Sequence, residues 1–247
     1  MDLFFDHHIH GDTICREDFP AEAASLESAL RSLEPSLYEL GGFSESSRPK
    51  KPKRHEREIA GERKPFLLPV NQRAMNQAVS KTLKGDGWRS EPVAAGPMSG
   101  PDVPLNLRGD FVRNGIFVEV EFGNIASMFR DFFKFQIASR AGAGEVGVLV
   151  TATERLAKFF DSGVTTFEAA RRYRPYLAIG VQMPVWIIGM EPSDFSSIGH
   201  RYEEMRILCE ENGLSCHPFG LALGADIPVD VEQSAEDPNE PREPEWS

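Results

Sequence analysis

The stretch that decides the fold is Leu105–Phe122, LNLRGDFVRNGIFVEVEF. Asn114 and Gly115 stand between two runs rich in apolar residues, and an Asn-Gly pair in that setting predicts a β-hairpin with a two-residue type I′ turn. Counting outward from that turn places Asp110 opposite Glu119. Directly opposed residues of a hairpin have Cβ atoms about 5 Å apart, so these two carboxylates are expected to lie close together.

The same count brings a third acid to the pair. Glu121 lies two residues beyond Glu119, so it shares the same face of its strand, and Arg108 falls opposite it unless a bulge at Gly109 shifts the outer pairs. Like charges this close destabilise a hairpin unless they are neutralised. Mg²⁺ prefers oxygen ligands, so the acids predict a metal site. A merely solvated acidic strand is the alternative, and three alternating apolar residues argue against it by predicting a buried opposite face: Val118, Val120 and Phe122.

The remaining segments predict strands mixed with helices. The apolar patterns and breakers favour strands over 2–5, 145–151 and 182–190, and helices over 20–40, 68–84, 124–140, 153–161, 165–173 and 200–212. This mixture predicts an α/β (α+β) fold with a central mixed β-sheet flanked by helices. We expect one catalytic and DNA-binding domain over 1–224, followed by an acidic, disordered tail over 225–247.

The net charge of −11 does not exclude a nucleic-acid partner. The segment from Asp226 to Ser247 holds eight acids and one arginine, a net of −7, which leaves −11 − (−7) = −4 for the rest. A basic loop at about 45–64 has seven Lys or Arg against three Glu from Pro49 to Lys64. It is either a solvated loop or a segment that contacts phosphates. The candidate DNA contacts in it are Lys50, Lys51, Lys53 and Arg54.

Several features point to a protein of the cytoplasm without a membrane partner. No apolar run approaches the roughly 20 residues of a membrane helix, and the first residues lack the basic and apolar regions of a signal peptide. The three cysteines include no CxxC pair, which fits a reducing compartment better than a disulfide scaffold. They are Cys15, Cys209 and Cys216.

The residues from Asp110 to Asn124 resemble the active-site region of BglII/BstYI-like type II restriction endonucleases, in the PD-(D/E)xK nuclease superfamily. The shared pattern is DFV, a spacer, then VEVEFGN. The likeness runs over roughly residues 65–192 and implies a restriction-endonuclease-like fold. It also implies a metal site made by Asp110, Glu119 and the backbone carbonyl of Val120.

The resemblance leaves the role of residue 121 open. The superfamily usually has lysine at this place, the nearest relatives have glutamine, and BamHI-like enzymes have glutamate. Glu121 is therefore a candidate catalytic residue beside Asp110 and Glu119, as general base or as an extra metal ligand, unless it serves only as the partner of Arg108. Asn124 falls where such enzymes can contact DNA.

The resemblance further implies Mg²⁺-dependent hydrolysis of double-stranded DNA, with Mn²⁺ as a substitute. The site would be palindromic and GATC-centred, and the products would carry 5′-phosphates. Such enzymes are homodimers and belong with a cognate DNA methyltransferase. The helix predicted over 124–140 is a candidate dimer interface, or else part of the core, because aromatic side chains lie on more than one of its faces: Phe129, Phe132, Phe133 and Phe135.

Two other functions stay open from the sequence. One is a catalytically inactive DNA-binding or DNA-mimic protein that uses the acidic tail. The other is a metal hydrolase built on the DHHIHGD segment, because histidines two residues apart, such as His8 and His10, can bind Zn²⁺. His7 precedes them, and the remaining histidines stand in no recognisable ligand motif. The plainer interpretation is a polar loop after the first strand.

Overall fold

The computed structural model describes residues 1–37, 58–59, 62–63, 66–67, 69–92, 94, 107–160, 163–177, 179–211 and 215–216. Its strands are β1 (Asp2–His8), β2 (Glu58–Ile59), β3 (Glu62–Arg63), β4 (Phe66–Leu67), β5 (Arg89–Ser90), β6 (Phe111–Arg113), β7 (Ile116–Val120), β8 (Val146–Ala152), β9 (Val185–Glu191) and β10 (Ser215–Cys216). Its helices are α1 (Gly11–Asp18), α2 (Pro20–Arg31), α3 (Gln72–Gly85), α4 (Ile125–Arg140), α5 (Glu154–Ala157), α6 (Phe167–Leu177) and α7 (Ser196–Glu211).

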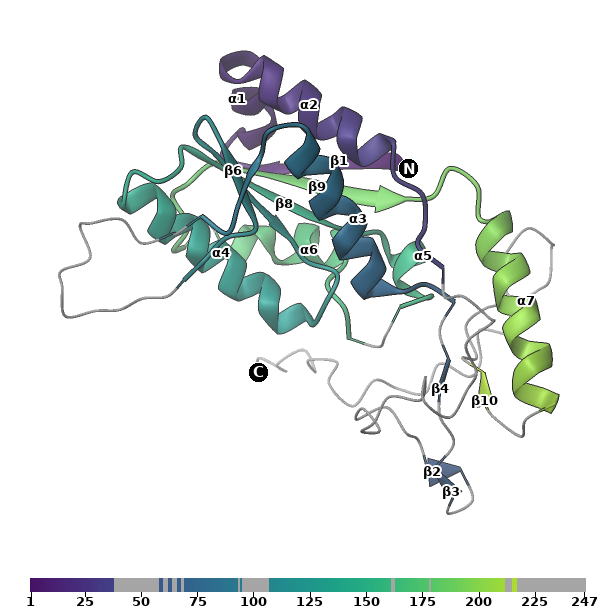
Figure 1. The fold of residues 1–247 in the computed structure, drawn as a ribbon. Coiled ribbons are helices and arrows are strands. Elements are labelled where there is room, and N and C mark those ends of the chain that lie inside the picture. Colours follow the sequence, from purple (N-terminus) through teal and green to yellow (C-terminus); the bar gives the residue numbers. More distant parts are fainter. Residues whose placement is uncertain are drawn as a thin grey trace, which may run out of the picture.

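Six strands form a central mixed sheet in the order β1-β9-β8-β7-β6-β5 (Figure 1). β7, β8 and β9 run parallel in its middle. β1 joins antiparallel on one side, and β6 and β5 join antiparallel on the other. Parallel neighbours need a crossover connection, which α4 provides between β7 and β8 and which α5 and α6 provide between β8 and β9. The predicted mixed sheet flanked by helices is confirmed.

Helices cover both faces of this sheet (Figure 1). On one face, α1, α2 and α3 share a core with Val118 and Val148. On the other, α4 and α6 share a core with Phe117 and Leu149. Successive strand residues point to opposite faces, so Glu119 lies on the same face as Phe117, beneath α4. The sheet therefore delivers one of the predicted site residues into the interior.

The hairpin that joins β6 to β7 has the predicted turn. Asn114 and Gly115 have φ angles of 44° and 94°, as a type I′ turn requires. The Glu22 carboxylate of α2 accepts a hydrogen bond from Asn114 Nδ2 at 2.7 Å, which ties the turn to the helix layer. The inner register is also confirmed, with three pairs: Arg113–Ile116, Val112–Phe117 and Phe111–Val118.

The outer part of the hairpin departs from the prediction. Asp110 N still donates to the Val118 carbonyl oxygen of β7 at 3.2 Å, but the residues before it bond to the segment after β5, where Gly109 N donates to the Pro92 carbonyl oxygen at 2.9 Å. Arg108 Nη1 donates to the Glu91 carbonyl oxygen at 3.2 Å. The β6–β7 ladder ends at Phe111–Val118, so it does not extend to the pairing of Arg108 with Glu121 that an unbroken ladder predicts.

Three other boundaries differ from the prediction. The helix expected over 20–40 ends at Arg31, because Pro35 keeps the residue before it out of helical conformation. The segment after β1 forms α1, whose N-cap His10 has a left-handed φ and makes no side-chain cap bond, so the usual helix-start signal is missing. Within the expected basic loop, β2 and β3 pair antiparallel.

Some sequence predictions lie outside the described residues. These are the acidic tail over 225–247 and the four basic candidates for DNA contact: Lys50, Lys51, Lys53 and Arg54.

We expect Gly115→Ala to lower the free energy of unfolding by about 1–2 kcal/mol, because a left-handed φ strains a residue with a Cβ. An added Cβ would also lie 3.2 Å from Glu145 Oε1. Gly85→Ala is the matched control, since a Cβ there meets nothing within 4 Å. Urea denaturation measures both, and equal stability of the Gly115 variant and wild type would contradict the turn assignment.

Candidate active site

The hairpin brings Asp110 and Glu119 together at the end of β7. Asp110 directly precedes β6, and its Oδ2 accepts a hydrogen bond from the backbone N–H of Val120 at 2.7 Å. The N–H and C=O of one strand residue face the same neighbour, so the Val120 carbonyl is directed toward the Asp110 side. Glu119 is 2% exposed. The three predicted metal ligands, which are Asp110, Glu119 and the Val120 carbonyl, therefore lie close together at the end of β7.

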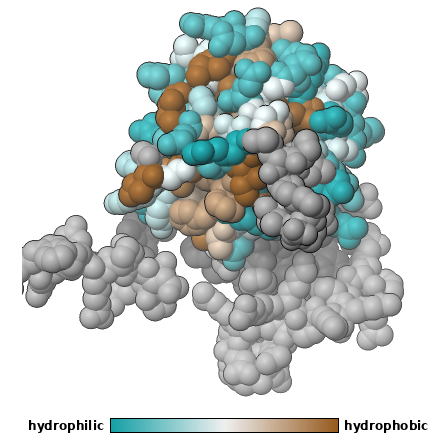
Figure 2. All heavy atoms as spheres, turned by 90° about the vertical axis from the view of Figure 1, so that its left-hand side faces the viewer, coloured by the Kyte–Doolittle hydropathy of each residue, from teal (hydrophilic) through white to brown (hydrophobic). Residues whose placement is uncertain are grey.

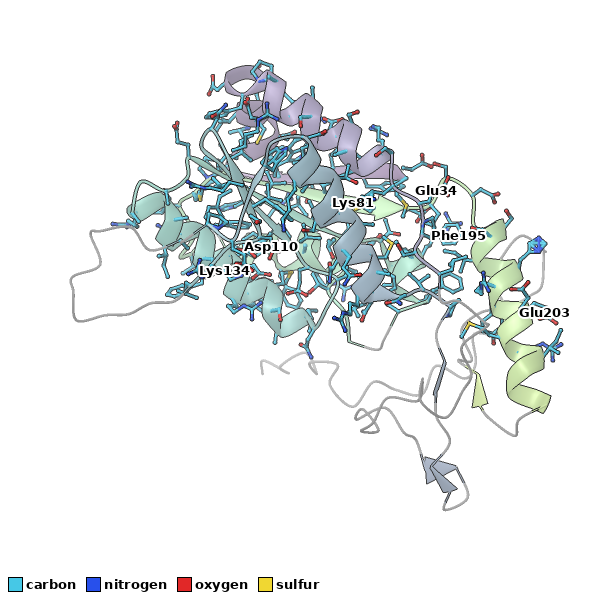
Figure 3. All side chains as sticks on the ribbon, viewed as in Figure 1. Glu34, Lys81, Asp110, Lys134, Phe195 and Glu203 are labelled. Carbon is cyan, nitrogen blue, oxygen red and sulfur yellow. The ribbon has the colours of Figure 1, made fainter. Side chains whose placement is uncertain are left out.

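A lysine that the sequence did not single out completes this site. Lys134 Nζ in α4 lies 2.8 Å from Glu119 Oε2 and 2.9 Å from Asp131 Oδ1. Figure 3 shows Asp110 and Lys134 side by side where α4 passes the sheet, and the charge of Lys134 acts on Asp110. An ion pair from α4 thus reaches the carboxylate pair of the hairpin.

The signal for these two residues was present in the sequence. Met128, Phe132 and Phe135 mark the buried stripe of α4, and Asp131 and Lys134 are also buried. Charged residues are almost never fully buried unless they are paired. Two charges of opposite sign in an apolar helical stripe therefore indicate a polar partner on the facing element, although they do not say which residue it is.

One carboxylate oxygen of Glu119 has no hydrogen-bond partner among the described residues. This oxygen, Oε1, is buried. It faces Gly109, where an added Cβ would lie 3.2 Å from Oε1 and 2.2 Å from the Phe117 ring. Buried polar atoms in native proteins almost always have a partner. An orphaned carboxylate oxygen beside a second carboxylate and a backbone carbonyl is a donor set that fits a hard divalent cation.

Glu121 lies at the margin of the site. It follows the last residue of β7, and its Oε1 accepts a hydrogen bond from Gly123 N at 2.5 Å. Arg130 Nη2 is 3.7 Å from its other oxygen. Within the described residues no three His, Cys, Asp or Glu side chains form a metal-holding group. The structure thus does not gather Glu121 with Asp110 and Glu119 into such a group. The strand ends before Glu121, whose side chain lies near Arg130 of α4.

Burial sets the electrostatics of the acids. Desolvation raises the pKa of Asp110, against the hydrogen bond from Val120 N. Desolvation, followed by the charges of Asp110 and Asp131, raises the pKa of Glu119 to about 9. Burial would lower the pKa of Lys134, but its bond to Glu119 raises it. Both acids therefore hold a proton more readily than usual, and a cation bound beside them would favour their ionised forms.

The pKa of Glu121 is raised to about 7, mainly by desolvation and then by the charge of Asp131. This value differs from that of Glu119 because Glu121 is the less buried of the two and has Arg130 beside it. A carboxylate with a pKa near neutrality can both take and release a proton under working conditions.

Asn124 has a structural role at the start of α4. Its Oδ1 accepts a hydrogen bond from Ala126 N at 2.8 Å, so it is the N-cap of the helix. Gln72 Nε2 of α3 donates to the Phe122 carbonyl oxygen at 2.7 Å. These two side chains fix the connection between β7 and α4.

The histidines at the end of β1 and just after it form no metal-binding group among the described residues. His8 Nε2 lies 2.8 Å from the Val181 carbonyl oxygen, and His7 Nδ1 lies 2.9 Å from Asp12 Oδ1. Together with His10 they line a cavity of about 340 Å³. It adjoins β1, the edge strand, three strands across the sheet from β7. Among the described residues no metal-binding trio includes them.

We expect the metal-free protein to lose stability as pH rises between about 4.5 and 9, the ordinary and folded pKa values of Glu119. In that window the folded state keeps a proton that the unfolded chain has released, so the slope is negative, on the order of 1 kcal/mol per pH unit. Urea denaturation in EDTA across this range measures it.

Glu119→Gln should reduce that slope, because the amide does not titrate. Glu17→Gln, at an exposed position of α1, is the control and should leave the slope unchanged. An identical slope in wild type and Glu119→Gln would show that Glu119 is not the group that holds the proton.

Comparison with known proteins identifies the family and the fold. A model of the family described as restriction endonuclease BglII/BglIII matches residues 3–190. The chain is similar to the crystal structure of restriction endonuclease BglII complexed with a DNA 16-mer, with a TM-score of 0.56, 14% identity, and coverage of 78% of this chain and 80% of that one. Free BglII gives a TM-score of 0.51, 15% identity, and coverage of 78% and 81%. A search of curated proteins finds no match.

The structural matches establish a shared fold, and the family match extends over most of the chain. None of the described helices is long and apolar enough to cross a membrane. The family match favours a nuclease over an inactive DNA-binding protein and over a histidine-based hydrolase. The chain belongs to the BglII/BglIII family of restriction endonucleases, which are site-specific deoxyribonucleases.

Proposed function

We propose that this nuclease hydrolyses double-stranded DNA at a palindromic, GATC-centred site in a Mg²⁺-dependent reaction that leaves 5′-phosphates. The observation that carries the metal dependence is the orphaned Glu119 Oε1, which is buried near Asp110 and has no hydrogen-bond partner among the described residues. The DNA substrate and its symmetry rest on the family and on the active-site motif.

Asp110, Glu119 and the carbonyl of Val120 would hold the cation, and Mn²⁺ would replace Mg²⁺. A divalent cation bound there lowers the pKa of a water molecule and stabilises charge on the scissile phosphate and leaving oxygen. The burial of Glu119 beneath α4 excludes bulk water from its side chain and strengthens its attraction to a cation. The backbone N–H of Val120 holds Asp110 in place by its bond to Oδ2.

Glu121 is proposed as the general base. The pKa of Glu121 is raised to about 7, whereas that of Glu119 is raised to about 9. A general base works best when its pKa lies near the working pH. One oxygen of Glu121 accepts from Gly123 N, which orients the carboxylate. It would take the proton of the attacking water and return it to solvent.

The proposed assembly is a homodimer that pairs the exposed aromatic stripe of α4 with its symmetry mate. Phe129 and Phe133 are one helical turn apart and are 44% and 60% exposed. Phe129 packs on Tyr173 of α6 at a centroid distance of 5.3 Å, and Tyr176 is 69% exposed. A two-fold dimer matches a palindromic site, with one active site for each strand.

DNA contacts are proposed for Asn124 and for four residues of the basic segment: Lys50, Lys51, Lys53 and Arg54. The solved BglII relative is described as complexed with DNA, which supports a DNA-binding role for this fold. Asn124 caps α4 through its amide oxygen, so a contact to DNA would come from its amide nitrogen. We also propose a cognate DNA methyltransferase as the partner that protects host DNA.

We predict that Asp110→Asn and Glu119→Gln abolish Mg²⁺-dependent cleavage of long DNA, because each removes a charged ligand of the proposed cation. Binding of the uncleaved DNA in Ca²⁺ should persist, as measured by gel shift. Asp2→Asn, at an exposed position of β1, is a control that should cut normally. Discrete fragments from the Asp110 variant would contradict the proposal.

Glu121→Gln should lower the single-turnover cleavage rate by about 10²–10⁴-fold, the usual contribution of a general base. It should leave direct Mn²⁺ binding within a few-fold of wild type, because Glu121 is not a proposed ligand. A large loss of Mn²⁺ affinity would instead make Glu121 a ligand.

Phe133→Asp should weaken the dimer by at least about tenfold, measured by sedimentation at micromolar concentrations, because it places a charge in the proposed apolar contact. Ile207→Asp is the matched control, at a position on α7 that is 45% exposed. A dimer unaffected by the Phe133 change would exclude this face as the interface.

A further inference from the structure

The buried lysine of α4 is not assigned by the motif or by the nuclease function proposed above. We propose that Lys134 is a positioning residue of the active site, which holds one oxygen of Glu119 so that the other oxygen faces the cation. The inference rests on the proposed metal site and adds a residue outside the motif to it. The structure places Lys134 fourteen positions after Val120, on a different element from every predicted ligand.

The contact between Lys134 and Glu119 is short and buried. Lys134 Nζ donates to Glu119 Oε2 at 2.8 Å in a buried hydrogen bond, and the two side chains are 8% and 2% exposed. An ammonium buried in this way is strongly disfavoured unless it is paired. Its presence is explained only by the acids that it contacts.

A second acid fixes the lysine from its other side. Asp131 precedes Lys134 by one helical turn, and its Oδ1 lies 2.9 Å from Nζ. Lys134 therefore spans Asp131 and Glu119. If its side chain swung away, Glu119 would lose this ion pair, whereas Asp131 would keep Arg130 Nη2 at 3.5 Å. Arg130 is different, because it is 56% exposed and lies 3.7 Å from Glu121.

The bond to Lys134 determines which oxygen of Glu119 remains free for a cation. With Oε2 engaged, the remaining Oε1 is the buried oxygen without a partner. Gly109, the residue before Asp110, lies against that oxygen. Carboxylates that bind metals are held by such outer hydrogen bonds, and loss of one typically costs 10–100-fold in affinity or activity.

The test is direct Mn²⁺ binding in the absence of DNA, by electron paramagnetic resonance of the free ion, for wild type and Lys134→Met. If Lys134 acted only through its charge, its removal would leave the site more negative, and Mn²⁺ would bind more tightly to Lys134→Met than to wild type. Positioning predicts binding that is weaker by about 10–100-fold. Lys81→Met, at an exposed position of α3, is the matched control and should bind as wild type does.

Two further variants secure the result. Lys134→Gln keeps an N–H donor without the charge, and should bind Mn²⁺ with an affinity between those of wild type and Lys134→Met. If Lys134→Met does not fold, as judged by circular dichroism, Lys134→Gln carries the test. In a Glu119→Gln background, Lys134→Met should weaken binding by no more than about twofold, because the lysine acts through Glu119.

The inference is overturned if a folded Lys134 variant binds Mn²⁺ as tightly as wild type or more tightly. If wild type both binds Mn²⁺ and cleaves DNA while that variant is unaffected, Lys134 has no positioning role and the proposed function stands. If wild type neither binds Mn²⁺ nor cleaves DNA, the proposed function fails and this inference fails with it.

Discussion

The burial of Glu119 beneath α4 is the constraint on which the site depends. The sheet is covered on both faces, so a carboxylate near the end of β7 that points to α4 enters the interior, where it is 2% exposed. A charge there requires partners, and α4 supplies Lys134 at 2.8 Å. Burial still raises the pKa of Glu119 to about 9 despite Lys134, and a further cation would favour its ionised form.

The hairpin controls how the second carboxylate meets the first. The Asn114-Gly115 turn sets the register of β6 and β7, and Glu22 anchors that turn to α2. The chain then leaves the ladder one residue before β6, which frees the Asp110 side chain to accept from Val120 N instead of standing in the sheet. The turn and the departure of the chain at Gly109 thus bring the two acids together beyond the regular strand pairs.

The sequence predicted those parts of the fold that local patterns encode. The turn type, the inner register and the apolar face of β7 followed from neighbouring residues, and Asp110 and Glu119 are together as expected. Long-range contacts could not be predicted in this way. The pairing of 107–110 with 91–94 replaced an Arg108–Glu121 contact, and Lys134 reaches Glu119 only because α4 crosses back over the sheet. α1 was missed because its N-cap lacks a capping side chain.

The face shown in Figure 2 has hydrophobic side chains among hydrophilic ones. The proposed metal site lies in the interior, where Glu119 is 2% exposed. Anomalous diffraction from crystals soaked in Mn²⁺ tests it most directly. The account predicts a peak coordinated by Asp110, Glu119 Oε1 and the Val120 carbonyl. A peak at Glu121 or at the histidines after β1, with none at Asp110, would contradict it.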